Sequence, residues 1–172
     1  MATVSRISVS EYLHEIYRPD RDYVDGKVQE RNMGEKEHSA WQGALAEYFR
    51  RHRKEWGLRV YPELRVQVSP TRFRVPDIML LRRDAPDEQI ITQPPLVCIE
   101  ILSPEDRFGR IEERIADYLS LGVREVWVID PVVVQGYRCK GANPRDWQQT
   151  NQLTVEGTPI TVDLAEIVAD LD

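Results

Sequence analysis

The sequence has little cysteine and no long run of apolar residues. Its two cysteines, Cys98 and Cys139, are too few for a disulfide framework and argue against a thiolate zinc site, so we expect a cytoplasmic protein. No apolar stretch approaches the roughly twenty residues that span a bilayer, and the first residues lack the apolar core of a signal peptide. We therefore expect neither secretion nor a membrane partner.

Positive charge is also in short supply. The 23 Lys and Arg residues against 29 Asp and Glu residues give a formal net charge of −6, which argues against wholesale attraction to nucleic acid or anionic membranes. A local basic strip can still bind phosphates. Basic residues gather in two places, Arg50, Arg51, Arg53 and Lys54, and Arg72, Arg74, Arg82 and Arg83.

The order of apolar and turn residues predicts an α/β fold with a mixed central sheet flanked by helices. The length and the 41% hydrophobic composition fit a single domain over residues 1–172. Capping, turn and periodicity patterns mark the boundaries of its elements. The expected elements are a short helix after Ser8, a hairpin at 23–28, a long helix at 35–56, antiparallel strands at 64–68 and 73–81, a buried strand at 96–102, a helix at 108–121, a parallel strand at 125–130 and a closing helix at 162–171.

Two carboxylates stand in otherwise apolar segments. Asp77 lies in VPDIMLL, and Glu100 lies in the middle of VCIEIL. On adjacent strands the two acids would lie a few ångströms apart, and such a pair ionises together only around a cation. Mg²⁺ or Mn²⁺ prefers oxygen ligands of this kind. The alternative interpretation is a structural ion pair between Glu100 and an arginine.

The segments VPDIMLL, VCIEILSPEDR and GVREVWVIDP, with a helix before the last, resemble the Uma-two family of restriction-endonuclease-like proteins. The resemblance runs from DYVDGKVQER to VIDP, which is nearly the whole chain. It implies the PD-(D/E)XK fold and a metal-dependent endonuclease that acts on DNA. It also implies that Asp77 and Glu100 bind the metal ion, Mg²⁺ or Mn²⁺.

The chain departs from this motif at its lysine. The motif lysine would stand two residues after the acid, where this sequence has Leu102, and members of the family typically recover a lysine at the position of Arg114. Arg114 falls on an apolar helical stripe that runs from Arg107 to Tyr118. An arginine cannot act as a base at neutral pH, so we expect it to hold a phosphate or to stabilise negative charge. The alternative is an arginine whose stem packs and whose head reaches water.

Two further residues are weaker candidates for the site. His38 lies on the stripe of the long helix with Trp41, and the resemblance implies that it orients water or substrate; a core or capping histidine is the alternative. Glu30 and Glu35 flank the start of that helix. We prefer Glu30 as the acid that assists the metal, although hydration or capping of the helix also explains either residue.

The missing lysine leaves other functions open. The chain could be a catalytically weakened or inactive nuclease-fold protein that serves as a nucleic-acid- or protein-binding module, or a structural dimer with an acidic ion-pair cluster. The segment VVVQ at 132–135 predicts an edge strand that pairs across a homodimer. The sequence leaves DNA and RNA both open as the nucleic acid.

Overall fold

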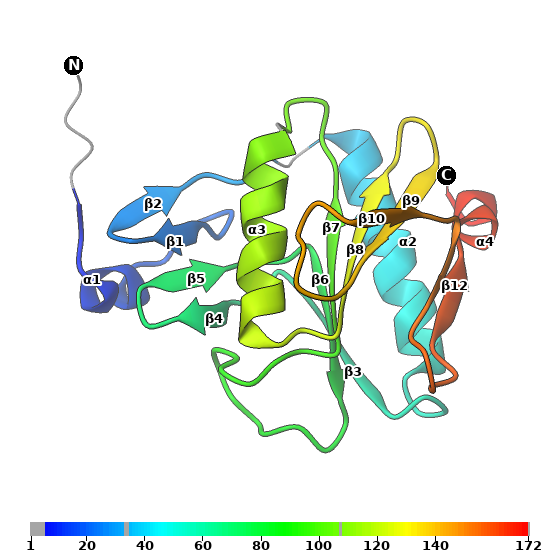
Figure 1. The fold of residues 1–172 in the computed structure, drawn as a ribbon, viewed down its shortest axis with the longest axis horizontal. Coiled ribbons are helices and arrows are strands. Elements are labelled where there is room, and N and C mark those ends of the chain that lie inside the picture. The colour runs from blue at the N-terminus through cyan, green and yellow to red at the C-terminus, as the bar shows by residue number, and fades with distance from the viewer. Residues whose placement is uncertain (1–5, 33–34, 107, 172) are drawn as a thin grey trace.

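The structure is a computed structural model that describes residues 6–32, 35–106 and 108–171. Figure 1 shows a central sheet between helices, with a smaller sheet on the side of the N-terminus. The elements are α1 (Val9–His14), β1 (Asp22–Val24), β2 (Lys27–Gln29), α2 (Lys36–His52), β3 (Leu58–Pro62), β4 (Val66–Ser69), β5 (Arg72–Arg74), β6 (Ile78–Arg82), β7 (Val97–Ile101), α3 (Phe108–Leu121), β8 (Glu125–Asp130), β9 (Gln135–Cys139), β10 (Trp147–Gln149), β11 (Gln152–Thr154), β12 (Thr161–Asp163) and α4 (Leu164–Ala169).

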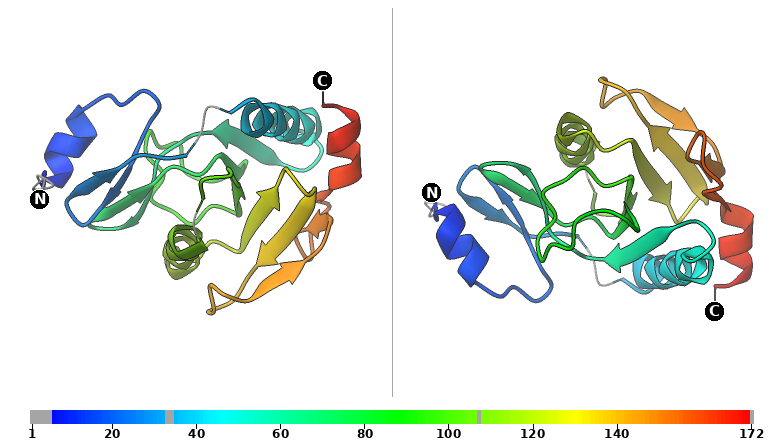
Figure 2. Two further views of the ribbon diagram at one scale, coloured as in Figure 1. Left: turned by 90° about the horizontal axis from the view of Figure 1, so that it is seen from above. Right: turned by 90° about the horizontal axis from the view of Figure 1, so that it is seen from below.

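The large sheet has six strands in the order β10-β9-β8-β7-β6-β3. β7 and β8 are parallel and are connected through α3, as the sequence predicts, while the other neighbours are antiparallel. Figure 2 shows α2 and α3 on opposite faces of this sheet. Side chains alternate between the faces, so Ile99 and Ile101 pack in the core beside α2, while Cys98 packs in the core beside α3.

The small sheet has four strands in the order β2-β1-β5-β4. The Asp-Gly hairpin predicted at 25–26 is confirmed, because β1 and β2 pair on either side of it. Tyr12 of α1 packs against Tyr23 and Phe73 in a separate cluster. The capping box that begins α1 is also present, since Ser8 and Glu11 exchange hydrogen bonds.

Residues 75–77 link the two sheets. The sequence predicts one returning strand over 73–81, but β5 ends at Arg74 in the small sheet and β6 begins at Ile78 in the large sheet. Pro76 explains the break, because proline has no N–H to donate to a strand ladder. β4 and β5 pair antiparallel as expected, whereas β6 pairs with β3 and β7. The link places Asp77 where the two sheets meet.

Two other expectations differ from the structure. The long helix ends at His52 rather than near Trp56, and a turn containing Gly57 at φ 63° leads into β3. Residues 131–134 form a turn in which Val132 and Val133 are exposed, and only Gln135 of the edge expected at 132–135 belongs to a strand, β9, which lies between β10 and β8. The expected edge strand is therefore wrong. Asp130 explains the turn, because its carboxylate accepts hydrogen bonds from the N–H groups of Val132 and Val133.

Each helix among the described residues is too short or too polar to span a bilayer.

The core beside α2 makes the first testable prediction. Phe49→Ala should lower the free energy of unfolding by about 3–5 kcal/mol, because the ring of Phe49 is fully buried beside Trp127. Phe108→Ala is the matched control, since Phe108 is 75% exposed and should change stability by less than about 0.5 kcal/mol. Urea unfolding of the two variants measures the difference, and equal losses would contradict this assignment of the core.

Candidate active site

Asp77 is buried at the junction of the two sheets, and three groups approach its carboxylate. Oδ1 accepts a hydrogen bond from Arg31 Nη2 at 2.7 Å, and Oδ2 accepts one from the N–H of Ile101 at 2.7 Å. His38 Nε2, from the first turn of α2, lies 3.2 Å from Oδ2. Because Ile101 follows Glu100 on β7, the backbone bond ties Asp77 to the strand that carries the second acid.

The structure places His38 beside the acid pair, because its Nε2 lies 3.2 Å from Asp77 Oδ2. The residue is 2% exposed. Burial lowers the pKa of His38, but the adjacent Asp77 carboxylate outweighs burial and raises the pKa above its usual value. Asp77 is affected in the opposite sense. Burial raises the pKa of Asp77, but His38 and Arg31 outweigh it and hold that pKa below its usual value.

Glu100 is buried in β7 and has two hydrogen-bond donors on one oxygen. Its Oε1 accepts from Arg114 Nη2 at 2.7 Å and from the Tyr118 hydroxyl at 2.5 Å. Burial raises the pKa of Glu100 to about 7; Arg114 opposes this shift and the charge of Asp77 adds to it. The positive charge of Arg114 therefore does not fully offset the cost of burying the charged form of Glu100.

Arg114 lies on α3 with its guanidinium buried. Besides Glu100, its Nη2 donates to the carbonyl of Val75 at 2.9 Å, and its Nη1 donates to the carboxylate of Asp22. The ion pair offered as an alternative for Glu100 is thus present. The interpretation of Arg114 as an arginine whose head reaches water is wrong, since the residue is 8% exposed. Arg107, at the start of the expected stripe, lies outside the described residues.

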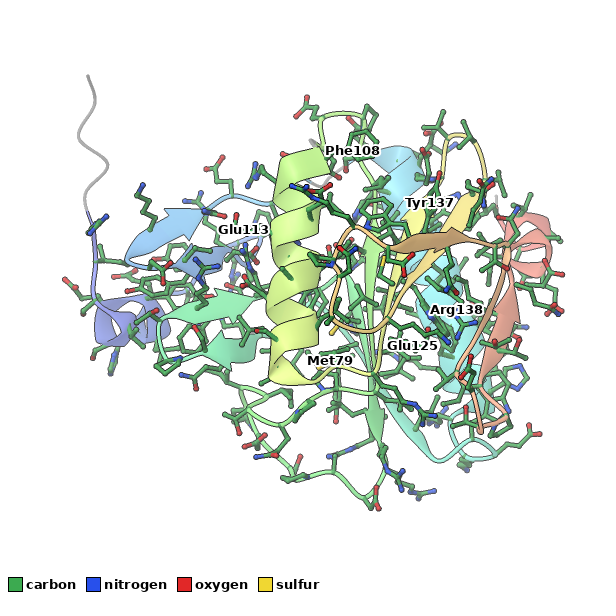
Figure 3. The ribbon with its side chains drawn as sticks, viewed as in Figure 1. Met79, Phe108, Glu113, Glu125, Tyr137 and Arg138 are labelled. Carbon is green, nitrogen blue, oxygen red and sulfur yellow. The ribbon has the colours of Figure 1, made fainter. Side chains whose placement is uncertain are left out.

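A chain of buried ion pairs continues from Arg114 into the small sheet. Arg74 donates to Asp22 at 3.0 Å and to Asp117 of α3 at 2.7 Å, and Arg72 donates to Asp117 at 3.0 Å. Figure 3 shows Glu113 on the side of α3 that faces this sheet, and Arg72 lies 3.4 Å from it. Arg74 is 1% exposed and bound to two acids, so within its basic cluster it is not available to a phosphate. These pairs join α3 to the small sheet.

Glu30 is not brought to the acid pair. Its carboxylate is 77% exposed and forms an ion pair with Arg21 at 2.9 Å. Its backbone carbonyl accepts a hydrogen bond from Arg110 Nη2 at 2.7 Å. Glu35 precedes α2 without capping it through its side chain.

Asp77 and Glu100 line one small cavity of about 30 Å³. This volume is about that of one water molecule in the liquid. The other lining residues are Arg31, Asn32, Ile101, Asp106, Arg110, Ile111 and Arg114.

Four polar residues at this cavity escaped the sequence analysis, namely Arg31, Asn32, Asp106 and Arg110. Asp106 accepts hydrogen bonds from Asn32 at 2.9 Å and from the N–H of Ser103 at 2.6 Å, and Arg110 is exposed on α3. Arg31 pairs with Asp77, as described above. Asp106 belongs to the segment VCIEILSPEDR and follows a predicted buried strand, which is a signal that could have found it.

The chemistry of these donors fits a divalent cation. Two carboxylates share the cavity, and no hydrogen bond from a described residue reaches Glu100 Oε2. The raised pKa of Glu100 indicates that another positive charge here is favourable. Among residues 6–32, 35–106 and 108–171 no group of three His, Cys, Asp or Glu side chains could hold a metal, so the protein would supply two carboxylates and solvent would complete the shell.

The Uma2 family model, described as "Putative restriction endonuclease", matches residues 9–169. The chain belongs to the Uma2 family. A crystal structure from Anabaena variabilis ATCC 29413, described as "a putative nuclease belonging to DUF820", superposes with a TM-score of 0.78 at 21% sequence identity, covering 95% of this chain and 98% of that chain. No curated protein matches the chain. The Uma2 resemblance seen in the sequence and the α/β restriction-endonuclease-like fold are confirmed.

The buried ion pairs predict a large effect of a single substitution. Asp22→Asn should lower the free energy of unfolding by about 3 kcal/mol, because it removes the charge that Arg74 and Arg114 share in the interior. Asp25→Asn is the matched control, since the Asp25 side chain is 51% exposed and its pair with Arg72 should contribute less than about 1 kcal/mol. Thermal and urea unfolding measure both, and a neutral Asp22→Asn would contradict the network.

Glu100 predicts a pH dependence of stability in the metal-free protein. Its folded-state pKa of about 7 lies above the usual 4.5, so the folded protein binds the extra proton and stability falls as pH rises from 4.5 to 7. Relative to Glu100→Gln, the wild type should lose about 3 kcal/mol between pH 5 and pH 8, at about 1.4 kcal/mol per pKa unit.

The comparison with Glu100→Gln isolates this residue, because His38 also destabilises the wild type as pH rises through its raised pKa. The part of the His38 contribution that Asp77 causes is present in both proteins and cancels in the difference, whereas the part that the charge of Glu100 causes belongs to the effect of Glu100. The measurement is urea unfolding in EDTA at a series of pH values. Parallel curves for the two proteins would rule out the raised pKa.

Proposed function

We propose that this protein is a metal-dependent endonuclease that hydrolyses phosphodiester bonds of DNA, with Mg²⁺ or Mn²⁺ held by Asp77 and Glu100. The single observation that carries the proposal is the shared cavity of these two buried carboxylates, in a chain of the Uma2 family. The proposal treats residues 1–172 as one domain, because buried ion pairs of α3 join the small sheet to the large one.

A bound divalent cation would supply the chemistry that the arginine cannot, by polarising the scissile phosphate and by lowering the pKa of a water molecule. The chain's own residues have separate tasks. Asp77 is held with its oxygens fixed by Arg31 and the N–H of Ile101. Asp106, in the same cavity, is the carboxylate that we assign to orienting the attacking water, in place of Glu30.

The positively charged side chains near the acid pair also have separate tasks. Arg114 acts in this proposal as a positioning residue for Glu100, because its Nη1 and Nη2 already donate to buried acceptors. We assign the phosphate contact expected for Arg114 to Arg110 instead, because Arg110 is exposed at the same cavity. His38 is a positioning residue for Asp77, and the pH profile of cleavage by a His38→Asn variant would report that role.

A non-catalytic binding module for nucleic acid or protein is the second candidate. It is favoured by Arg31 and Arg114, which already neutralise part of the charge of the acid pair. A homodimer also stays a prediction, although the turn at 131–134 offers no strand for pairing.

Plasmid cleavage separates the two candidates. The wild type should nick plasmid DNA with Mg²⁺ or Mn²⁺ and should not do so in EDTA. Asp77→Asn and Glu100→Gln should each lower the rate by at least about two orders of magnitude, because each removes a charge that holds the ion, worth several kcal/mol. Glu30→Gln is the matched control and should keep the wild-type rate, since its side chain is 77% exposed.

Melting curves complete the design. All four proteins should show cooperative unfolding, which establishes that lost activity is not lost folding. Mg²⁺ or Mn²⁺ should raise the melting temperature of the wild type but not of Asp77→Asn, because a ligand of the folded state stabilises it. DNA binding by the wild type without cleavage, and without any effect of metal on melting, would favour the binding module.

A further inference from the structure

A groove with a basic lining lies between α2 and the edge strand β3. It encloses about 760 Å³, and its lining contains five cations and no carboxylate. The cations are Arg50, Arg53, Lys54, Arg59 and Arg83. Figure 2 shows α2 beside β3, with α2 on the face of the large sheet away from α3. We call this hollow the α2–β3 groove.

The cations of the α2–β3 groove are available to a ligand. Arg50, Arg53, Lys54 and Arg83 are all exposed, and none of them forms an ion pair with a described residue. Arg59 is the exception, because its Nη2 donates to the backbone carbonyls of Ala85 and Pro86 and its Nη1 lies 3.4 Å from the exposed carboxylate of Asp87. Three other exposed arginines, Arg51, Arg82 and Arg145, are each paired with a carboxylate. The groove is thus a local surplus of positive charge on a protein with a net charge of −6.

The helix dipole does not account for this cluster. Cations at the end of α2 interact favourably with its C-terminus, which explains Arg50 and Arg53. Arg59 comes from β3 and Arg83 from the turn after β6. The N–H of Arg83 donates to the carbonyl of Gly57 at 2.8 Å, which fixes that turn against the end of α2. Three separate elements therefore bring their cations to one groove.

A second hollow adjoins the α2–β3 groove and continues along α2 toward its N-terminal half. It encloses about 600 Å³, shares Arg50 and Arg53 with the groove, and extends to Gln42 and Glu63. Gln42 Nε2 donates to the backbone carbonyl of Asp77 at 2.9 Å. The two hollows therefore run along α2 from Gln42, which contacts the backbone of Asp77, to the cations at the end of the helix.

The length of α2 between Gln42 and Arg53 can be expressed as a number of base pairs of DNA. At a rise of 1.5 Å per residue, Gln42 and Arg53 lie about 16 Å apart along α2. Duplex DNA rises about 3.4 Å per base pair, so 16 Å corresponds to about five base pairs. Nucleic-acid backbones present phosphates continuously over such a distance, and guanidinium groups bind them well.

We propose that the α2–β3 groove binds the phosphate backbone of a nucleic acid about five base pairs from the bond that is cut. This inference rests on the proposed function and adds to it a second binding region, remote from the acid pair. It assigns the groove to holding the substrate and leaves the acid pair to the reaction.

The first test is the salt dependence of binding. A labelled duplex of about 20 base pairs is titrated with protein in EDTA, which prevents cleavage, at several NaCl concentrations. The triple variant Arg53→Gln, Lys54→Gln, Arg83→Gln should lower the slope of log K against log salt by about 0.9 for each phosphate that the protein no longer neutralises. The matched control carries Arg6→Gln, Arg18→Gln and Lys27→Gln. These are also exposed cations without an ion pair to a described residue, at the far side of the molecule, and the control should keep the wild-type slope.

The second test varies the length of the substrate. The wild type should cleave a duplex that extends about eight base pairs beyond the cut faster than one that extends about three, because only the longer one reaches the groove. This advantage should disappear in the triple variant and persist in the control. Melting temperatures equal to the wild type establish that the exposed substitutions leave the fold intact.

The outcomes are distinguishable. A triple variant with the wild-type salt slope and the wild-type length preference overturns the groove while leaving the nuclease intact. A wild type that neither binds nor cuts the duplex overturns the proposed function as well. A triple variant that binds DNA normally but no longer binds an acidic peptide assigns the groove to a protein partner and overturns this inference.

Discussion

The buried guanidinium of Arg114 is the interaction on which the rest of the site depends. It binds the carboxylates of Asp22 and Glu100 and the carbonyl of Val75, which belong to the small sheet, the large sheet and the link between them. Removing one member of such a set leaves an uncompensated charge in the interior. The positions of α3, of both sheets and of the acid on β7 are therefore fixed together. Asp77 benefits indirectly, since the link that carries it begins at Val75.

The ion pairs of Asp77 and Glu100 with arginines affect how the two acids would bind a cation. Arg31 and Arg114 each neutralise one acid, yet the pKa of Glu100 stays near 7, so the cavity retains a demand for positive charge. A divalent ion would meet that demand but would compete with Arg31 for Oδ1 of Asp77. The affinity for such an ion would then be a difference between two favourable interactions, and substitutions of Arg31 would change it although Arg31 is not a proposed ligand.

Local patterns in the sequence predict the helices, the strands and the two acids. Contacts between residues far apart in the sequence cannot be predicted in this way. The Asp-Gly hairpin, the periodicity of α3 and the apolar runs of β7 and β8 are local signals, and each agrees with the structure. The change of sheet at 75–77 leaves no local signal beyond Pro76, because residues on both sides of it are buried. Arg31 and Asp22 are separated in sequence from the side chains that they bind by tens of residues, so only the fold reveals their pairing. Burial of Arg74 escaped for the same reason.

The small sheet is held to the rest of the molecule by the ion pairs of α3 and by Val66 and Val68 of β4, which pack in the core beside α3. Its own apolar cluster is limited to Tyr12, Tyr23 and Phe73 with a few partly buried neighbours, whereas the large sheet has an extensive core on each face. Regions with few buried apolar contacts open locally at lower free energy than the whole protein unfolds. Each such opening would withdraw Asp22 from Arg114 and loosen Glu100. Glu100 therefore stays ordered only while the small sheet remains packed against α3. The small sheet is thus a place at which the site can be controlled.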